Sequence, residues 1–245
     1  MPFTISDFFS SGIIGKYFFE TPWIILGAAI IIISAYLLGS INFAIIISGK
    51  KYKEDIRSYG SKNAGMTNMM RTYGKTAAAL TLTGDAMKAI VACLLGYAIL
   101  GQLGAYIAGL FCMLGHVFPV FYRFKGGKGV VTAFAAVLMC DPFVFVIIAI
   151  IFVLIVLFTR YISLGSIMCM FLYPIILDRV TNILTLFGYG KATTSPYIIF
   201  PILMAALVVI KHWENIKRLV SGTENKFSFK KSVKTPESNS EDVTK

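Results

Sequence analysis

Long apolar segments separated by short polar ones make up most of the chain. A membrane-spanning helix needs about 20 predominantly apolar residues. Six segments approach or exceed this length, and a shorter one adds a seventh: 23–48, 76–100, 103–122, 130–140 (the short one), 142–158, 161–177 and 197–213. The pattern therefore predicts an all-α, polytopic membrane protein with seven transmembrane helices.

The two ends of the chain differ from this central part. Residues 1–22 mix aromatic and polar side chains and lack the basic start of a signal peptide, so they are predicted to form an uncleaved interfacial segment. Residues 222–245 are rich in Ser, Lys and Glu and are predicted to form a disordered cytoplasmic tail. The membrane domain is then expected to comprise residues 23–221.

The amino-acid composition also indicates a membrane protein, and the distribution of basic residues predicts its orientation in the membrane. Of the 245 residues 57% are hydrophobic and 14% are charged, whereas soluble domains are about 25% charged. With seven spans, 19 of the 23 Lys and Arg residues fall on one side, in 49–75, 123–129, 159–160 and 211–245. The opposite side holds Lys16, Arg179 and Lys191. Because basic residues stay in the cytoplasm, the N-terminus is predicted outside and the C-terminus in the cytoplasm.

The four cysteines do not form a recognisable metal or redox motif. They lie in or beside apolar segments, without CxxC or His–Cys ligand spacing, at Cys93, Cys112, Cys140 and Cys169. Such cysteines are typical small core side chains. We predict no disulfide framework, no metal site and no cofactor.

The first polar motif lies in residues 55–68 and is dense in hydroxyl, amide and glycine residues, with arginine nearby. Donors and flexible backbone of this kind suit an oxyanion such as phosphate. For Lys50, Lys51 and Lys53, just before the motif, anionic lipid headgroups are the simpler partners.

The second motif is the glycine-rich segment 125–129, with the sequence KGGKG. Glycines let successive N–H groups converge on an anion, and a lysine adds a charge. The segment lacks the full GxxxxGK[ST] pattern of nucleotide-binding loops, so a nucleotide is not expected. A flexible turn is the alternative reading of the segment.

The third motif, 211–219, follows the last span. His212, Asn215 and Leu219 have helical spacing and share one face. A second polar pair, Asp85 and Lys88, lies inside the span 76–100. Intramembrane charges are costly and often functional, but a self-neutralising structural pair is an equal alternative.

Taken in order, these motifs resemble those of the bacterial acyl-phosphate-dependent glycerol-3-phosphate acyltransferases. The similarity extends from Leu38 to Lys226 and rests on GSINFA, DIRSYGSKNAGMTN, FKGGKGVVT and HWENIKRLVSGTE. Asn42, Lys62 and Trp213 depart from the family pattern. The resemblance implies a membrane enzyme that transfers an acyl group from a long-chain acyl phosphate to the sn-1 hydroxyl of glycerol 3-phosphate. The products are lysophosphatidate and phosphate, in the first step of phospholipid synthesis.

The resemblance and the chemistry of the polar motifs together suggest roles for individual residues. Catalytic roles fall on Ser40, Arg57, His212 and Asn215. Substrate binding is predicted for Ser61, Asn63, Thr67, Asn68, Lys88, Gly126, Gly127, Lys128, Gly129 and Ser163. Asp85 and Glu224 are predicted to be structural. We expect Arg57, Lys128 and the glycine-rich segment to bind glycerol 3-phosphate, and Ser40, Ser61, Asn68 and Asn215 to orient the acyl phosphate.

An acyl phosphate is already activated, so this reaction demands neither a covalent nucleophile nor a metal. It needs two anion sites and alignment of a hydroxyl with a carbonyl. The proton acceptor is either His212 or a substrate phosphate oxygen, and the latter is favoured. We expect the protein in the bacterial cytoplasmic membrane, with its active site facing the cytoplasm. The alternative function is a membrane transporter or binder of phosphate esters. Chain-length preference and oligomeric state do not follow from the sequence; a monomer is consistent with it.

Overall fold

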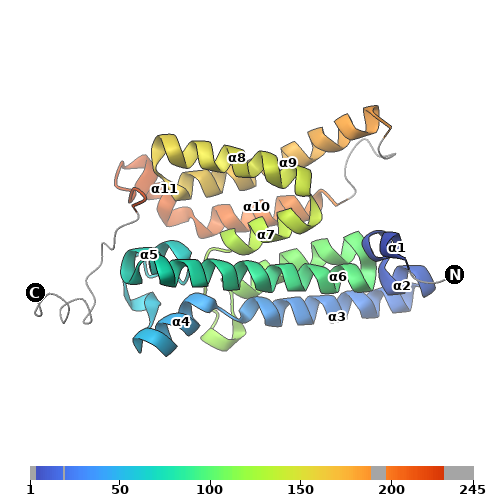
Figure 1. The fold of residues 1–245 in the computed structure, drawn as a ribbon, viewed down its shortest axis with the longest axis horizontal. Coiled ribbons are helices and arrows are strands. Elements are labelled where there is room, and N and C mark those ends of the chain that lie inside the picture. The colour runs from blue at the N-terminus through green and yellow to red at the C-terminus, as the bar shows by residue number, and fades with distance from the viewer. Residues whose placement is uncertain (1–3, 19, 189–196, 229–245) are drawn as a thin grey trace, which may run out of the picture.

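The protein is a bundle of helices, and within the described residues no strand is present. The computed structural model describes residues 4–18, 20–188 and 197–228. The predicted all-α class is confirmed. The helices run roughly along one axis (Figure 1). In chain order they are α1 Ile5–Ser10, α2 Gly12–Tyr17, α3 Thr21–Ser40, α4 Phe43–Tyr52, η1 Ile56–Ser58, α5 Met66–Tyr73, α6 Lys75–Val117, η2 Val120–Tyr122, α7 Val130–Cys140, α8 Pro142–Thr159, α9 Ile162–Leu186, α10 Ile199–Lys211 and α11 Trp213–Val220.

Helix α6 contains the predicted second and third spans, which fold back on each other. Leu100 and Gly101 leave helical geometry, and Gly101 has φ +59, which glycine adopts without strain. Beyond this break the chain reverses direction. The two halves of α6 then lie so close that a Cβ on Gly96 would be only 2.2 Å from the carbonyl oxygen of Gly104. The α6 hairpin therefore brings residues from the two spans into direct contact.

The predicted first span, 23–48, lies within the apolar stretch Thr21–Tyr52 and consists of two helices with a break at residues 41–42. Helix α3 ends at Ser40, and α4 begins after Asn42, whose side-chain oxygen accepts a hydrogen bond from the Ile45 N–H (3.2 Å). Lys88 of α6 donates to the carbonyls of Gly39 (2.9 Å) and Ile41 (2.6 Å), which the break leaves without helical partners. Backbone groups inside a membrane need such a neighbour.

The remaining predicted spans correspond to helices whose ends are shifted. Helix α9 extends to Leu186 in spite of Pro174, and α7 is short, as expected. The last span bends by 61° between α10 and α11. Four stretches of the described residues are long and apolar enough to cross a membrane, and α10 with α11 would make a fifth. Seven crossings and their orientation stay a prediction.

The surface of the bundle is apolar, as expected for contact with lipid. Helix α8 buries only Val144 and Ile148, while Phe143 and Phe158 are 70% and 84% exposed. The four cysteines are buried, as predicted. Helices α1 and α2 pack against α6. Of the predicted tail, residues 229–245 lie outside the described residues.

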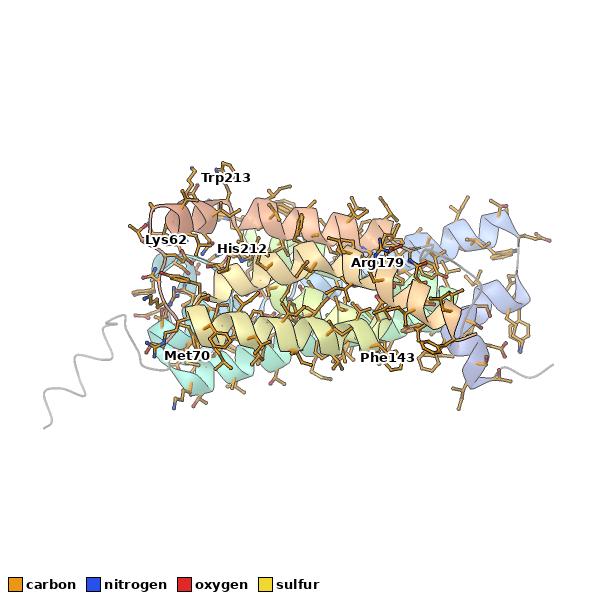
Figure 2. The ribbon with its side chains drawn as sticks, turned by 90° about the horizontal axis from the view of Figure 1, so that it is seen from above. Lys62, Met70, Phe143, Arg179, His212 and Trp213 are labelled. Carbon is orange, nitrogen blue, oxygen red and sulfur yellow. The ribbon has the colours of Figure 1, made fainter. Side chains whose placement is uncertain are left out.

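The polar segments of the chain gather at one end of the bundle. Helices α4, α5 and α11 lie there, and α1 and α2 lie at the other end (Figure 1). Lys62 and His212 share the first end, whereas Phe143 and Arg179 lie at the second (Figure 2). The three polar motifs, far apart in the sequence, are thus neighbours in space.

Candidate active site

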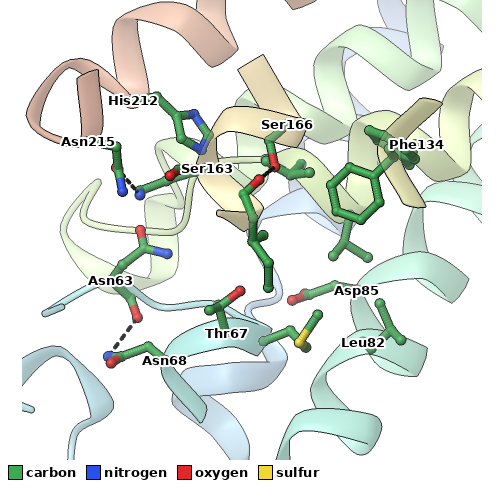
Figure 3. Close-up of a pocket in the computed structure, with 18 of the residues that line it drawn as sticks. Asn63, Thr67, Asn68, Leu82, Asp85, Phe134, Ser163, Ser166, His212 and Asn215 are labelled. Atoms are coloured by element: carbon green, nitrogen blue, oxygen red, sulfur yellow. Dashed lines mark hydrogen bonds between the residues drawn. The ribbon is translucent and has the colours of Figure 1, made fainter. Parts of the chain in front are cut away.

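A cavity of about 400 Å³ opens at the end of the bundle where the three motifs meet. One part of its lining is polar and comes from all three motifs and from the start of α9 (Figure 3): Ser61, Asn63, Thr67, Asn68, Arg71, Lys128, Ser163, Ser166, His212, Asn215, Arg218, Glu224 and Asn225. The other part is apolar and comes from α6, α7 and α8. The cavity therefore joins a polar end to a hydrophobic groove.

Glu224 is the centre of a hydrogen-bond network at the polar end. Its carboxylate accepts hydrogen bonds from Asn215 Nδ2 (2.6 Å), Ser163 Oγ (2.8 Å) and Arg218 Nε (2.7 Å). Burial opposes its ionisation, but the hydrogen bonds from Arg218, Asn215 and Ser163 outweigh burial and hold the pKa of Glu224 below its ordinary value. Residues 222–228, predicted to begin a disordered tail, thus include a residue that is hydrogen-bonded into the site.

Lys128 extends this network into the cavity, because its ammonium donates a hydrogen bond to Asn215 Oδ1. Burial is the main reason that the pKa of Lys128 falls to about 8, and repulsion by Arg218, Arg71 and Lys211 lowers it further against the attraction of Glu224. Three of these cations, Lys128, Arg71 and Arg218, line the cavity together with two carboxylates, Glu224 at the polar end and Asp85 at its border with the apolar part. The polar end therefore has an excess of positive charge that an anion would neutralise.

His212 is fixed with one ring nitrogen available. The side chain is 2% exposed, and Nδ1 lies 2.8 Å from the Val208 carbonyl. Since a carbonyl only accepts, Nδ1 carries the hydrogen, and Nε2 is left with a lone pair. His212 lines the cavity, so it presents a hydrogen-bond acceptor to whatever binds there.

Asn68 shapes the first motif rather than offering its amide to the cavity. Its Nδ2 donates to the carbonyls of Ile56 (3.2 Å), Tyr59 (2.9 Å) and Asn63 (3.1 Å), and its Oδ1 accepts from the Ser61 N–H (3.0 Å). Asn68 borders the cavity together with the other predicted residues of this motif, Ser61, Asn63 and Thr67. Ser61 and Asn63 precede the N-terminus of α5, and Thr67 lies in its first turn. The free N–H groups at this N-terminus favour anions.

Ser40 and Arg57, predicted as catalytic, are not among the residues that line the cavity. Ser40 Oγ donates to the Tyr36 carbonyl (2.9 Å) and accepts from the Val120 N–H (3.3 Å). Arg57 pairs with Asp55 (2.7 Å) and donates from one nitrogen to the carbonyls of Tyr122 (3.1 Å) and Lys125 (3.0 Å). Both side chains hold the loop 118–129, which carries Lys128.

The glycines of that loop are also explained by packing. A Cβ on Gly127 would lie 2.1 Å from His116 Nε2, and one on Gly126 would lie 2.0 Å from the His116 carbonyl oxygen. Gly127 donates its N–H to that carbonyl (3.1 Å). Only Gly129, with φ +80, lines the cavity. Gly126 and Gly127 therefore let the loop lie against α6, instead of facing the cavity as predicted for substrate binding.

Asp85 and Lys88 have places opposite to those predicted. Lys88, predicted to bind substrate, is buried between Asp85 Oδ1 and His116 Nδ1, each at 2.9 Å, and does not line the cavity. Asp85, predicted to be structural, does line it, as does His116. Figure 3 shows the Asp85 carboxylate at the junction between the polar end and the groove.

Arg71, Arg218 and Asn225 border the cavity although no role was predicted for them. Their signal was present as helical spacing, since Arg71 lies four residues after Thr67 and Arg218 three after Asn215. Within the described ranges no group of three or more His, Cys, Asp or Glu side chains is arranged to hold a metal ion.

The hydrogen bonds from Arg57 to the carbonyls of Tyr122 and Lys125, here called the Arg57 clamp, should restrain the loop 118–129. In an Arg57→Gln variant two hydrogen bonds from a charged donor are lost, each worth about 1.5–3 kcal/mol. We expect trypsin to cut after the exposed Arg123 and Lys125 at least about tenfold faster than in the wild type, as measured by mass spectrometry of the fragments. Lys50→Gln, on exposed α4, is the control. Unchanged cleavage in Arg57→Gln would show that the clamp is unimportant.

Comparison with known proteins identifies relatives along most of the chain. The family model described as glycerol-3-phosphate acyltransferase matches residues 29–222. The glycerol-3-phosphate acyltransferase of Finegoldia magna is 39% identical over 195 residues, 79% of this chain and 93% of that protein. The corresponding enzyme of Syntrophomonas wolfei is 41% identical over 202 residues, 82% of this chain and 98% of that protein.

Two solved structures share the fold. Both are crystal structures of PlsY, an integral membrane glycerol 3-phosphate acyltransferase. Its glycerol 3-phosphate form has a TM-score of 0.71 at 35% identity, and its lysophosphatidic acid form has 0.69 at 34% identity. Each alignment covers 82% of this chain and 96% of the other.

Proposed function

The chain belongs to the glycerol-3-phosphate acyltransferase family of integral membrane enzymes, and we propose that its acyl donor is a long-chain acyl phosphate. The reaction gives lysophosphatidate and inorganic phosphate. The hydroxyl oxygen of glycerol 3-phosphate forms an ester bond to the acyl carbon, and the bond from that carbon to the phosphate oxygen breaks. The leaving phosphate keeps the electron pair of the broken bond.

One observation carries this proposal: the cation-lined polar end and the apolar groove form a single cavity. A long-chain acyl phosphate has a charged head and an apolar tail joined at the reacting carbonyl. If the head lies at the polar end and the tail in the groove, the carbonyl lies at their junction. Glycerol 3-phosphate, which is small and charged, fits only the polar end.

The two phosphates are assigned to two halves of the polar end. Lys128, Asn215 and Arg218 bind glycerol 3-phosphate, because they offer the densest positive charge and hydrogen-bond donors. Ser61 and Thr67, beside the N-terminus of α5, bind the head of the acyl phosphate. Ser40 and Arg57 contribute by holding the loop of Lys128. Their catalytic importance is then indirect.

The proton of the attacking hydroxyl passes to a phosphate oxygen of a substrate, and His212 serves as a binder. If so, a His212→Gln variant should keep kcat within about threefold of wild type and raise KM for glycerol 3-phosphate. A true general base contributes about 10²–10⁴ to the rate, so a loss of kcat in that range would identify His212 as the base. Steady-state rates with both substrates varied distinguish the two results.

Lys128 should set an upper pH limit on kcat/KM for glycerol 3-phosphate. Because burial depresses its pKa to about 8, the free enzyme loses this positive charge as pH rises through 8, and kcat/KM for glycerol 3-phosphate falls above that pH. The profile of kcat/KM reports the free enzyme. An Arg side chain keeps its proton throughout, so Lys128→Arg should remove the limit even if its overall rate is lower. A limit at the same pH in this variant would rule out Lys128 as its source.

A transporter or binder of phosphate esters is the other candidate function. Transporters place their polar sites near the membrane midplane between structural repeats. Here the polar groups gather at one end of the bundle (Figures 1 and 3). With the excess of basic residues at that end, this supports seven spans in the bacterial cytoplasmic membrane, with the N-terminus outside and the active site facing the cytoplasm.

The choice of donor is tested by supplying glycerol 3-phosphate with either palmitoyl phosphate or palmitoyl-CoA and measuring lysophosphatidate. We expect product from palmitoyl phosphate alone. Formation of product at equal rates from palmitoyl-CoA would contradict the proposed donor while leaving the family activity intact.

A further inference from the structure

The apolar groove has walls from three helices that are matched in length. Lining residues occur over 82–90 of α6, 130–138 of α7 and 145–153 of α8. At 1.5 Å per residue, each stretch is about 12 Å long. Because α8 runs back along α7 after the one-residue connection at 141, residue 153 lies nearer the polar end and residue 145 nearer the deep end. Figure 2 shows Phe143, at the start of α8, at the end of the bundle away from His212.

The lining changes in size with depth. Next to the polar end stand Leu82, Val131 and Val153; halfway along stand Ala86, Ala135 and Ala149; at the deep end stand Ile90, Leu138 and Phe145. Each helix thus contributes an alanine at the middle level, with larger side chains above and below it on the same helix. These three alanines leave space at this level, beside the ring of Phe134.

Aromatic rings make one side of the groove rigid. Phe134 is edge-on to Phe152, with ring centroids 5.4 Å apart, and to Phe145, at 6.5 Å. Such edge-to-face pairs are favourable and fix the rings relative to one another. The space opposite the rings is therefore controlled by the small side chains.

The groove is also open to the surroundings of the bundle. Leu82, Leu138 and Val153 are 42%, 39% and 52% exposed although they line it. An acyl chain can leave the groove past Leu138, at the deep end, and continue in lipid. Since lipid is as apolar as the groove, burial alone would not discriminate between chains. Steric fit at the middle level of the groove would discriminate between acyl chains of different length.

We propose that Ala86, Ala135 and Ala149 select the acyl chain: they give a long straight chain room to pass the middle of the groove, whereas larger residues would admit only short chains. This inference rests on the proposed acyl phosphate donor. Ile90, Leu138 and Phe145 end the close contact, beyond which the chain extends into lipid. Overfilling a packed site is costly, so one enlarged alanine suffices to exclude a chain that reaches it.

The test compares kcat/KM for palmitoyl phosphate with kcat/KM for butanoyl phosphate in the same preparation. In Ala149→Phe and in Ala86→Phe we expect this ratio to fall at least about tenfold, with butanoyl phosphate turnover changed no more than about threefold. The controls are Ile150→Phe and Met87→Phe, neighbours that face lipid, are 56% and 50% exposed and do not line the cavity. Their ratios should stay within about twofold of wild type.

The test uses two alanines on different helices, so that it can still be read if one of the two variants does not fold. An unchanged ratio in whichever of the two is active would overturn the proposed selection while leaving the donor assignment intact. If the wild type uses no acyl phosphate of any length, the proposed function fails and this inference fails with it. A ratio that falls equally in the controls would also overturn it.

Discussion

Replacing Lys128 by methionine is expected to lower kcat/KM for glycerol 3-phosphate by about 10³. Lys128 is the half-buried cation that reaches the cavity from the glycine-rich loop and is hydrogen-bonded to Asn215. Methionine fills a similar volume without the charge. In a site with little water, loss of one preorganised donor to a developing charge costs about 10²–10³ in rate. Loss of binding to a dianionic substrate adds to this.

The matched control for this variant is Lys125→Met. Lys125 lies on the same loop, but it is exposed and absent from the cavity lining. Its charge is screened by water, so kcat/KM should remain within about twofold of wild type. A Lys128→Met enzyme that keeps more than a fifth of wild-type kcat/KM would remove Lys128 from the proposed phosphate site.

Replacing Asn215 by leucine is expected to lower kcat/KM by about 10². Asn215 links Lys128 to Glu224, since its oxygen accepts from the lysine and its nitrogen donates to the carboxylate. Leucine has a similar shape and removes both bonds, which leaves two charged groups incompletely paired at a cost of about 1–3 kcal/mol each. Lys128 then loses the orientation that the substrate phosphate requires.

A double-mutant cycle separates this link from two independent effects. If Asn215 acts through Lys128, the double variant Lys128→Met/Asn215→Leu should be within about threefold of Lys128→Met alone. Asn182→Leu, near the end of α9 that lies away from the cavity, should leave kcat/KM unchanged. Full additivity of the two losses would show that Asn215 acts without Lys128.

The sequence was informative about which segments meet and less so about which side chains face the cavity. Apolar segment length and charge asymmetry predicted the helices and the gathering of three polar motifs. Both depend on composition along the chain. The direction of a side chain depends on how each helix is rotated by its packing. Ser40 and Arg57 illustrate this, because both have the chemistry of phosphate ligands but point toward the loop that they hold.

The break between α3 and α4 coincides with Gly39, Ser40 and Asn42, the small and polar residues that interrupt this apolar run. It depends on Lys88, 47 residues after Ile41, which donates hydrogen bonds to the freed carbonyls. That partnership also explains why Lys88 turns away from the cavity and Asp85 reaches it. Only the three-dimensional arrangement shows which member of such a pair reaches the cavity.

Arg71 and Arg218 show the opposite case. Their spacing from Thr67 and Asn215 placed them on the right helix faces, but basic residues near a membrane surface are common. Only the folded chain distinguishes them from lipid-binding residues, because it places both in the lining of one cavity.

The most direct test of acyl transfer in this cavity is glycerol 3-phosphate-dependent release of inorganic phosphate from palmitoyl phosphate by the purified protein. The proposed function predicts one phosphate released per lysophosphatidate formed, and loss of both products in the Lys128→Met variant. Absence of release, or equal release without glycerol 3-phosphate, would contradict it.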